Sequence, residues 1–179
     1  MIWFTADTHF HHAAVIDYCK RPFSSVEEMD EAMVAGWNAK VARTDIVYHL
    51  GDFALARDHR QVRKTFGRLH GQKFLVRGNH DTETICEIGW AAKPEHITMK
   101  TVDSVQMILC HYAMRVWPGH HRGAIQLYGH SHGNLPNTHN SLDVGVDVWG
   151  FAPVSLDDIK RRLAEVPAPE WEPAGLTLP

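Results

Sequence analysis

Five short polar segments, each placed directly after an apolar run, most constrain what this 179-residue chain can fold into. In order, they are Asp7-Thr8-His9, Gly51-Asp52, Gly78-Asn79-His80-Asp81, His111, and Gly129-His130-Ser131-His132. Short apolar runs with such boundaries predict buried strands. Polar side chains that follow the strands of an open α/β sheet meet at its carboxyl edge, so the pattern predicts one site built from distant parts of the chain.

The first half of the chain alternates between strand-like and helix-like patterns. Apolar runs predict buried strands at 2–6, 46–50 and 73–76. Helical character, with apolar residues at spacings of three and four, predicts helices at 12–19, 26–41 and 62–69. Ser24 and Ser25 each precede a glutamate by three residues, which is typical of a helix N-terminus. This alternation predicts a parallel sheet with helices on both faces.

The pattern changes in the second half of the chain. After a short helix at about 84–88, extended runs predict strands at 96–102, 105–110, 125–128 and 142–148. Asp103-Ser104 joins the first two as a hairpin, and Ser155 begins a last helix. We therefore expect one α/β domain over residues 1–165, with two packed sheets flanked by helices. The Pro-rich residues 166–179 are expected to form an extended or disordered tail.

Composition and charge argue against several classes of protein. A net charge of −3 offers no basic surface for duplex DNA. Cys19, Cys86 and Cys110 are far apart and odd in number, which argues against a disulfide framework and favours a reducing cytoplasm. No apolar run approaches about 18 residues, and Met1 leads at once into a strand-like run. We therefore expect neither a membrane span nor a signal peptide.

The polar segments offer imidazole, carboxylate and amide groups as ligands for metal ions. Asp7 and His9 stand two residues apart, as do His130 and His132, so each pair can face one way. A nitrogen and oxygen donor set without sulfur suits manganese, iron, zinc, nickel or cobalt and argues against calcium or copper(I). Two such dications exceed the negative charge of Asp7, Asp52 and a shared hydroxide, and the remaining positive charge favours a phosphate.

Hydrolysis of a phosphate ester also needs a proton for the leaving oxygen. His80 lies beside Asn79, one of the candidate ligands, and is therefore the candidate acid. Asp81 follows directly, and we expect its carboxylate to orient the His80 imidazole. For contacts with the substrate we expect His12, next to the first ligand pair, and Arg122, which can bind phosphate through two hydrogen bonds.

The series D-x-H, G-D, G-N-H-D, H and G-H-x-H resembles the calcineurin-like metallophosphoesterase superfamily over residues 1 to about 160. The resemblance implies a four-layer α/β/β/α sandwich of two mixed β-sheets flanked by helices. It implies one metal site formed by Asp7, His9, Asp52 and His132, and a second formed by Asp52, Asn79, His111 and His130. Asp52 would bridge the two ions, and His80 would be the acid or transition-state stabiliser.

Within that superfamily the chain is more similar to the small single-domain bacterial and phage members. Phe53 and the four residues after it replace the V-D-R-G continuation of the protein serine/threonine phosphatases, which argues against protein-phosphatase activity. We expect a two-metal phosphoesterase, with Mn²⁺ as the first choice of ion, that acts on a small phosphate ester or a nucleotide. The alternatives are an inactive scaffold that binds other proteins, and a nuclease for short oligonucleotides.

Overall fold

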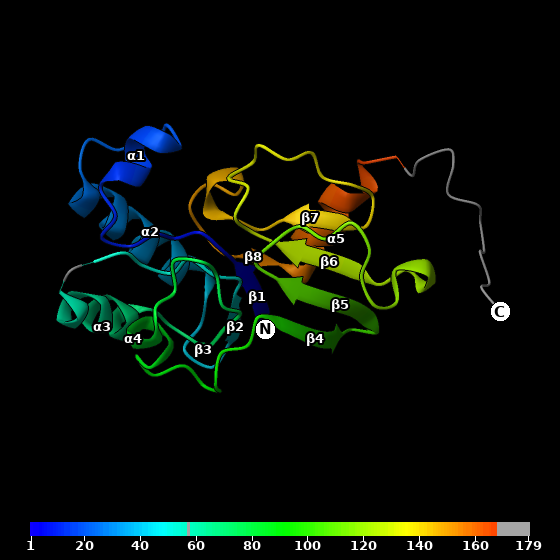
Figure 1. Ribbon diagram of the computed structural model, residues 1–179, viewed down its shortest axis with the longest axis horizontal. Helices are drawn as coiled ribbons and strands as arrows, with labels where there is room; N and C mark the ends of the chain where they lie inside the picture. Colours follow the sequence, from blue (N-terminus) through cyan, green and yellow to red (C-terminus); the bar gives the residue numbers. More distant parts are fainter. Residues whose placement is uncertain (57, 168–179) are drawn as a thin grey trace.

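Two four-stranded mixed sheets pack face to face in the computed structural model, which describes residues 1–56 and 58–167 (Figure 1). The first sheet has the order β3 (Gln72–Leu75), β2 (Ile46–His49), β1 (Ile2–Thr5) and β8 (Val154–Ser155). The second has the order β4 (Ile97–Val102), β5 (Val105–Cys110), β6 (Ile125–Tyr128) and β7 (Ser141–Asp143). The predicted tail lies outside the described residues from residue 168 onward.

Three strands of each sheet run parallel and one runs antiparallel. In the first sheet β1, β2 and β3 are parallel, and β8 pairs antiparallel with β1. In the second sheet β5, β6 and β7 are parallel, and β4 pairs antiparallel with β5. Asp103 and Ser104 both adopt left-handed backbone angles in the tight β4–β5 turn, as the strand twist of a two-residue hairpin requires.

The helices are α1 (Ala14–Tyr18), α2 (Val26–Lys40), α3 (His59–Arg68), α4 (Glu83–Cys86) and α5 (Leu156–Ala164). Two 3-10 turns, η1 (His120–Arg122) and η2 (Val146–Val148), complete the described elements. Of the two candidate serines, Ser25 caps α2, because its hydroxyl accepts a hydrogen bond from the amide of Glu28 at 3.2 Å. Ser155 and Asp158 form a complete capping box at the start of α5.

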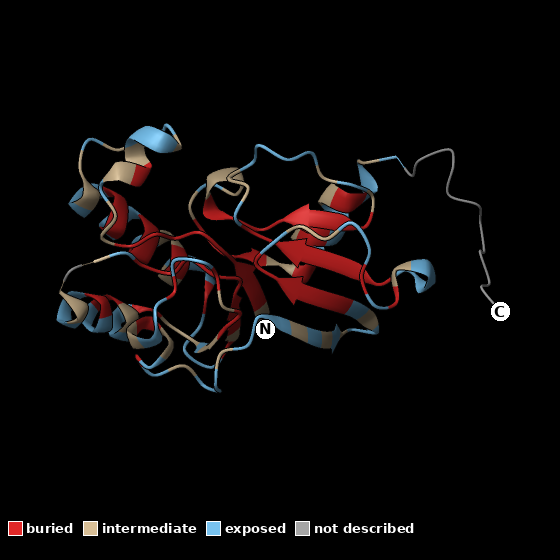
Figure 2. Ribbon diagram, in the orientation of Figure 1, coloured by how far each residue is buried: buried red, intermediate tan, exposed pale blue. Residues whose placement is uncertain are grey.

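Apolar side chains bury both faces of the first sheet. On one face Trp3 and Val47 pack with Met33 and Trp37 of α2. On the other face residues such as Phe4 pack against the second sheet, and this layer also contains the buried side chains of α5. Figure 2 shows that the central strands are almost wholly buried. Burying this apolar surface is the main stabilising contribution to the sandwich.

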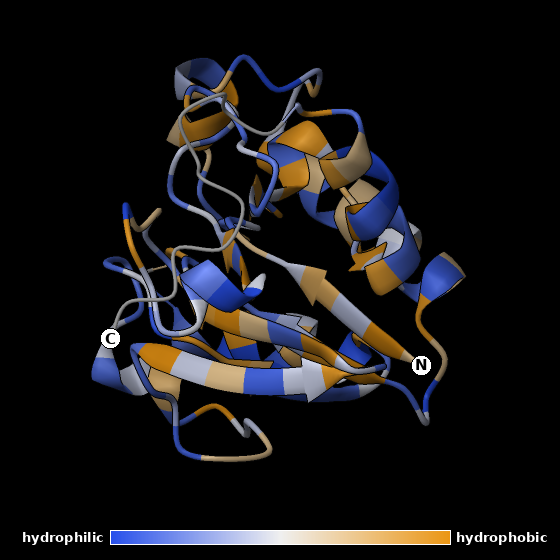
Figure 3. Ribbon diagram, turned by 90° about the vertical axis from the view of Figure 1, so that its right-hand side faces the viewer, coloured by the Kyte–Doolittle hydropathy of each residue, from blue (hydrophilic) through white to orange (hydrophobic). Residues whose placement is uncertain are grey.

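The second sheet has less helical cover on its outer face. Within the described residues, that face carries a small apolar cluster of Ile108, Trp117 and Ala124, with Met114 against it. Edge strand β4, in the foreground of Figure 3, alternates in burial, and Ile97 and Met99 are exposed. The prediction of two mixed sheets flanked by helices is confirmed.

One predicted strand is wrong in its extent. The run 142–148 was expected to be extended throughout, but β7 ends at Asp143 and residues 146–148 form η2. The chain leaves the second sheet here and joins the first: Gly145 forms a bridge with Ala6, and the Val146 amide donates to the carbonyl of Ala6 at 3.0 Å. Residues 142–148 therefore form backbone hydrogen bonds with both sheets. The pairing of β8 with β1 was not predicted. None of the described helices has the length and apolar character that crossing a membrane would need.

Candidate metal centre

The polar segments meet where strands of both sheets end. Asp7, Asp52 and Asn79 follow β1, β2 and β3, whereas His111 and His130 follow β5 and β6 (Figure 1). Backbone hydrogen bonds join neighbouring segments: the Asp7 amide donates to the Gly51 carbonyl at 3.0 Å. The Asp7 carboxylate accepts from the His130 amide at 2.9 and 3.0 Å, which links the two sheets. The predicted convergence of these residues is what the fold produces.

The backbone at this junction is unusual. Five of the candidate ligands have left-handed φ angles between 46° and 65°, namely Asp7, His9, Asp52, His130 and His132. Such angles are uncommon outside glycine and gather at functional sites, where the surrounding structure holds them. Glycines next to the ligands allow the close approach. A Cβ atom on Gly51 would lie 2.5 Å from His111 Nδ1, and one on Gly129 would lie 2.5 Å from Asp7 Oδ2.

The candidate ligands form two groups, each with its donor atoms within 4.8 Å of one another. One consists of Asp7, His9 and His132, and the other of Asp52, His111 and His130. Asp52 lies between the groups, because its Oδ2 is 3.6 Å from His9 Nε2 and 3.4 Å from His111 Nε2. Asn79 joins the second group, with Oδ1 at 3.1 Å from His111 Nε2.

The hydrogen-bond partners of the histidine rings indicate that this donor set fits a cation. His111 Nδ1 lies 2.8 Å from the Leu50 carbonyl, which can only accept, so Nδ1 carries the proton. In the neutral ring Nε2 then presents a lone pair to oxygens of Asp52 and Asn79. On the other side of Asp52, His9 Nε2 is buried and has no hydrogen-bond partner among the described residues. Divalent cations would satisfy these facing electron pairs, which would otherwise be costly to bury.

Burial also sets the charge of the ligands. It raises the pKa of Asp7 to about 7, although His111 and His132 beside it act in the opposite direction. Burial lowers the pKa of His9 to about 3, which keeps this imidazole neutral and able to bind a metal. The ionised form of such a buried carboxyl needs neighbouring positive charge, which bound metal ions would supply.

Two residues that the sequence patterns did not single out support the first group. His132 Nδ1 is 2.7 Å from Asp147 Oδ2. Asp147 in turn accepts hydrogen bonds from the buried Arg21 guanidinium at 2.7 and 2.9 Å. Arg21 also donates to the carbonyls of Asp7 and Thr8, at 2.7 and 3.0 Å. Asp147 was hidden in the run expected to be a strand, and no local motif marks Arg21.

Cys19 lies close to His132 and Asp147. Its sulfur, an imidazole nitrogen of His132 and a carboxylate oxygen of Asp147 are within 4.8 Å of one another. Burial, followed by the negative charge of Asp147, raises the pKa of the Cys19 thiol to about 11. The expectation of nitrogen and oxygen donors without sulfur stays a prediction.

The two residues predicted to act in proton transfer lie in different environments. His80 is half-exposed at the opening of the site, with Nε2 4.0 Å from Asp52 Oδ2, and its amide donates to Asp52 Oδ1 at 2.9 Å. Asp81 is buried, and its carboxylate accepts from the amides of Asp52, Phe53 and Gly78 at 2.8–3.0 Å. Within the described residues it makes no hydrogen bond with the His80 ring. The prediction that Asp81 orients that ring is wrong, because backbone donors occupy its carboxylate.

The predicted substrate-binding residues also separate. His12 stands at the site, with Nδ1 3.4 Å from His9 Nδ1 and its ring centroid 6.4 Å from that of His80. Its contact with a substrate stays a prediction. Arg122 lies in η1, before β6 begins, whereas His130 follows the end of β6 (Figure 1). Arg122 is therefore at the opposite end of the strand, and the prediction that it binds substrate at this site is wrong.

An α/β sandwich with clustered aspartate, histidine and asparagine donors at its strand ends has the arrangement expected of a metal-binding protein. The chain belongs to the calcineurin-like phosphoesterase family, whose sequence pattern matches residues 1–161. The protein is accordingly a phosphoester hydrolase that uses divalent metal ions.

Three similar proteins extend over most of the chain. The protein is 34% identical over 170 residues to MJ1445, an uncharacterized protein of Methanocaldococcus jannaschii, and the match covers 90% of each chain. It is 22% identical over 196 residues to the Gene 66 protein of Mycobacterium phage D29, covering 92% of this chain and 96% of that one. A protein of unknown function from Aquifex aeolicus, AQ665, has a similar crystal structure, with a TM-score of 0.72 at 18% identity, covering 90% and 98%. This last likeness shows the fold alone.

Proposed function

We propose that the protein hydrolyses a small phosphate ester at a centre of two divalent ions. The observation that carries the proposal is the position of Asp52 between two groups of donors whose lone pairs face one another. Asp7, His9, Asp52 and His132 would hold the first ion. Asp52, Asn79, His111 and His130 would hold the second. When bound, the pair of ions activates water and neutralises charge on the phosphate.

The residues around the centre have separate tasks. Asp147 holds His132 with Nε2 toward the site, and the Leu50 carbonyl does the same for His111. His80 is the group at the opening that can give a proton to the leaving oxygen. The backbone amide of His80 donates a hydrogen bond to Asp52 Oδ1, which places the acid beside the proposed bridging carboxylate, and its half-exposed side chain can reach a bound ester. His12 beside it is proposed to contact the phosphate or its ester group.

We further propose Mn²⁺ as the ion that supports turnover, with iron, zinc, nickel and cobalt as competitors, because the ligands are imidazole, carboxylate and amide groups. Monoesters, diesters and nucleotides all satisfy the chemistry of the centre. An inactive scaffold is the alternative, and the complete ligand set argues against it.

Metal analysis and hydrolysis together test the proposal. The purified full-length chain is expected to bind about two Mn²⁺ per molecule by equilibrium dialysis, and to hydrolyse a chromogenic phosphodiester or monoester. The Asp52→Asn variant should lose most of the bound metal and the activity. Binding of one ion with full activity would refute the two-ion centre, whereas tight metal binding with no hydrolysis of either ester would favour the scaffold.

A further inference from the structure

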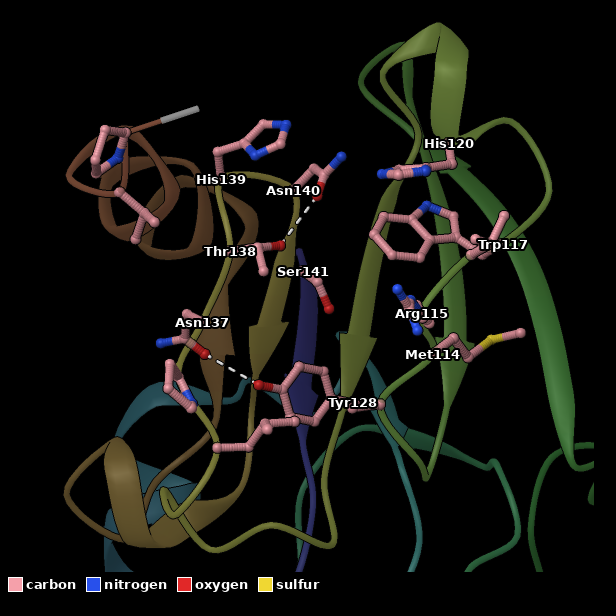
Figure 4. Close-up of a pocket in the computed structure, with 16 residues that line it drawn as sticks. Met114, Arg115, Trp117, His120, Tyr128, Asn137, Thr138, His139, Asn140 and Ser141 are labelled. Atoms are coloured by element: carbon pink, nitrogen blue, oxygen red, sulfur yellow. Dashed lines mark hydrogen bonds between the residues drawn. The ribbon is translucent and has the colours of Figure 1, made fainter. Parts of the chain in front are cut away.

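We propose that a groove on the outer face of the second sheet binds an apolar organic group of the ester substrate; this inference rests on the proposed function. The groove has a volume of about 660 Å³ (Figure 4). One wall is formed by residues 113–120, the other by residues 135–141, and Tyr128 of β6 lies between them. Val166 and Pro167 line one end.

Residues that line the groove lie close in sequence to the candidate metal ligands. Ala113 lies two residues after the candidate ligand His111, and Tyr128 lies two residues before His130. The second wall begins at Leu135, three residues after His132. Both walls thus begin within three residues of candidate metal ligands. Because His130 follows the end of β6, the Tyr128 end of the groove is the end nearest to the metal centre.

Tyr112 connects the two places. Its hydroxyl donates to Asn79 Oδ1 at 3.3 Å, and its ring centroid lies 4.7 Å from that of His130. The next residue, Ala113, lines the groove. An ester whose phosphate binds at the proposed ions would therefore meet Tyr112 and, next to it, the wall that begins at Ala113.

The lining favours an apolar group over a nucleotide base, which would need specific hydrogen bonds. Trp117 and Tyr128 contribute buried aromatic rings, and Val116 and Leu135 expose large apolar side chains. Several polar groups of the lining already pair with one another. Thr138 Oγ1 donates to Asn140 Oδ1 at 3.0 Å, and the Tyr128 hydroxyl donates to Asn137 Oδ1 at 3.3 Å (Figure 4). A space of this size, mostly apolar, is typical of a site for a small organic molecule.

A homologous series of substrates gives the direct test. In p-nitrophenyl phosphodiesters whose second group is methyl, butyl or octyl, the leaving group stays constant and only the apolar length changes. Each methylene that is fully buried raises affinity about fourfold. We expect kcat/KM to rise at least tenfold from methyl to octyl, chiefly through KM.

A charge in the groove should remove this dependence. Leu135→Glu places a carboxylate on an exposed position of the lining, so the chain is expected to fold normally and to lose the rise in kcat/KM from the methyl to the octyl ester. Met99→Glu is the matched control, since Met99 is exposed on the same sheet but does not line the groove. Loss of the length dependence in Leu135→Glu alone supports the proposal. Equal length dependence in all three proteins, or none in the wild type, overturns it.

Two further measurements separate the possible failures. Calorimetry with octyl phosphate and methyl phosphate tests binding in the groove without any hydrolysis. If the protein hydrolyses no ester, the proposed function is refuted, and this binding measurement still tests the groove. Tighter binding of octyl phosphate should again disappear in Leu135→Glu. The chain continues from Pro167 into residues outside those described, including Trp171. If Trp171→Ala in the full chain tightens octyl phosphate binding severalfold, the C-terminal residues compete for the groove as its natural occupant, and the proposal is overturned.

Discussion

His132 Nδ1 lies 2.7 Å from the carboxylate Oδ2 of Asp147, and this contact decides which ring nitrogen faces the metal centre. The carboxylate accepts a hydrogen bond from Nδ1–H, so in the neutral ring Nε2 keeps its lone pair. Arg21 holds the same carboxylate from the other side at 2.7 and 2.9 Å. A ligand held in this way loses less conformational freedom when it binds a metal.

Replacing Asp147 should therefore weaken metal binding without removing a proposed ligand. We expect Asp147→Asn to lower the affinity for Mn²⁺ about 10–100-fold, the range known for partners of metal-bound histidines. Isothermal calorimetry measures the affinity, and excess Mn²⁺ should restore hydrolysis. Asp157→Asn, on the exposed side of α5, is the control and should bind as the wild type does. An unchanged affinity in Asp147→Asn would exclude the orienting role.

His80 is expected to act in turnover and not in metal binding. His80→Ala should lower kcat by about 10²–10⁴-fold, the usual contribution of a positioned acid, while the amount of bound metal stays constant. His121→Ala provides the comparison, because His121 is exposed in η1 before β6. If His80→Ala loses metal in parallel with activity, His80 is a ligand and the proposed assignment is incorrect.

Asp81 is expected to matter for stability. Its buried carboxylate satisfies three backbone amides that join the loops after β2 and β3. Asp81→Ala leaves these donors unpaired, and a single buried unsatisfied group costs about 1–3 kcal/mol. We expect the free energy of unfolding to fall by about 3 kcal/mol or more in urea denaturation. Glu83→Ala removes an exposed ion pair with Arg77 and should change it by about 1 kcal/mol or less. Equal losses in the two variants would contradict this role.

Asp45 should control the stability of the protein in acid. Hydrogen bonds from the N-terminal ammonium, the Trp3 indole and the Ala42 amide lower the pKa of Asp45 from 3.8 to about 2. The unfolded chain therefore binds more protons than the folded chain between these two values. This stabilising contribution is complete above about pH 4 and is lost as the pH falls through about 2.

Thermal unfolding followed from pH 6 to pH 2 measures this contribution. Asp45→Asn should unfold at a lower temperature at pH 6 and should show a smaller decrease in acid than the wild type. Asp17→Asn, at an exposed position of α1, is the control and should follow the wild-type curve. Parallel curves for wild type and Asp45→Asn would refute the assignment.

The placement of the candidate ligands is the part of the site that local sequence patterns predict well. Apolar runs gave the strands, and the polar residues directly after them, such as Asp7 and His111, had to lie at strand ends. Arg122 shows the same rule in reverse. It precedes a strand that runs parallel to its neighbours, and the start of such a strand lies at the other edge of the sheet.

Other features depend on contacts between distant parts of the chain. Because Asp81 directly follows His80 in the sequence, a hydrogen bond between their side chains was expected. The loops after β2 and β3 approach each other closely, however, and three of their backbone amides bind the Asp81 carboxylate instead. Arg21 and Asp147 are 126 residues apart and meet only because the chain crosses from β7 to the first sheet. The outer groove likewise exists because two loops rise from neighbouring strands.

The sequence by itself thus indicated the family, two packed sheets flanked by helices and the candidate ligand residues, since short apolar runs and the polar residues next to them carry this information. The tertiary structure alone decided which nitrogen of His132 and His111 is free of the partners Asp147 and Leu50, what Asp81 binds, and that two loops form the outer groove. The physical reason is that hydrogen-bond partners and cavities arise from packing between segments, and local periodicity carries no information about which segments will meet.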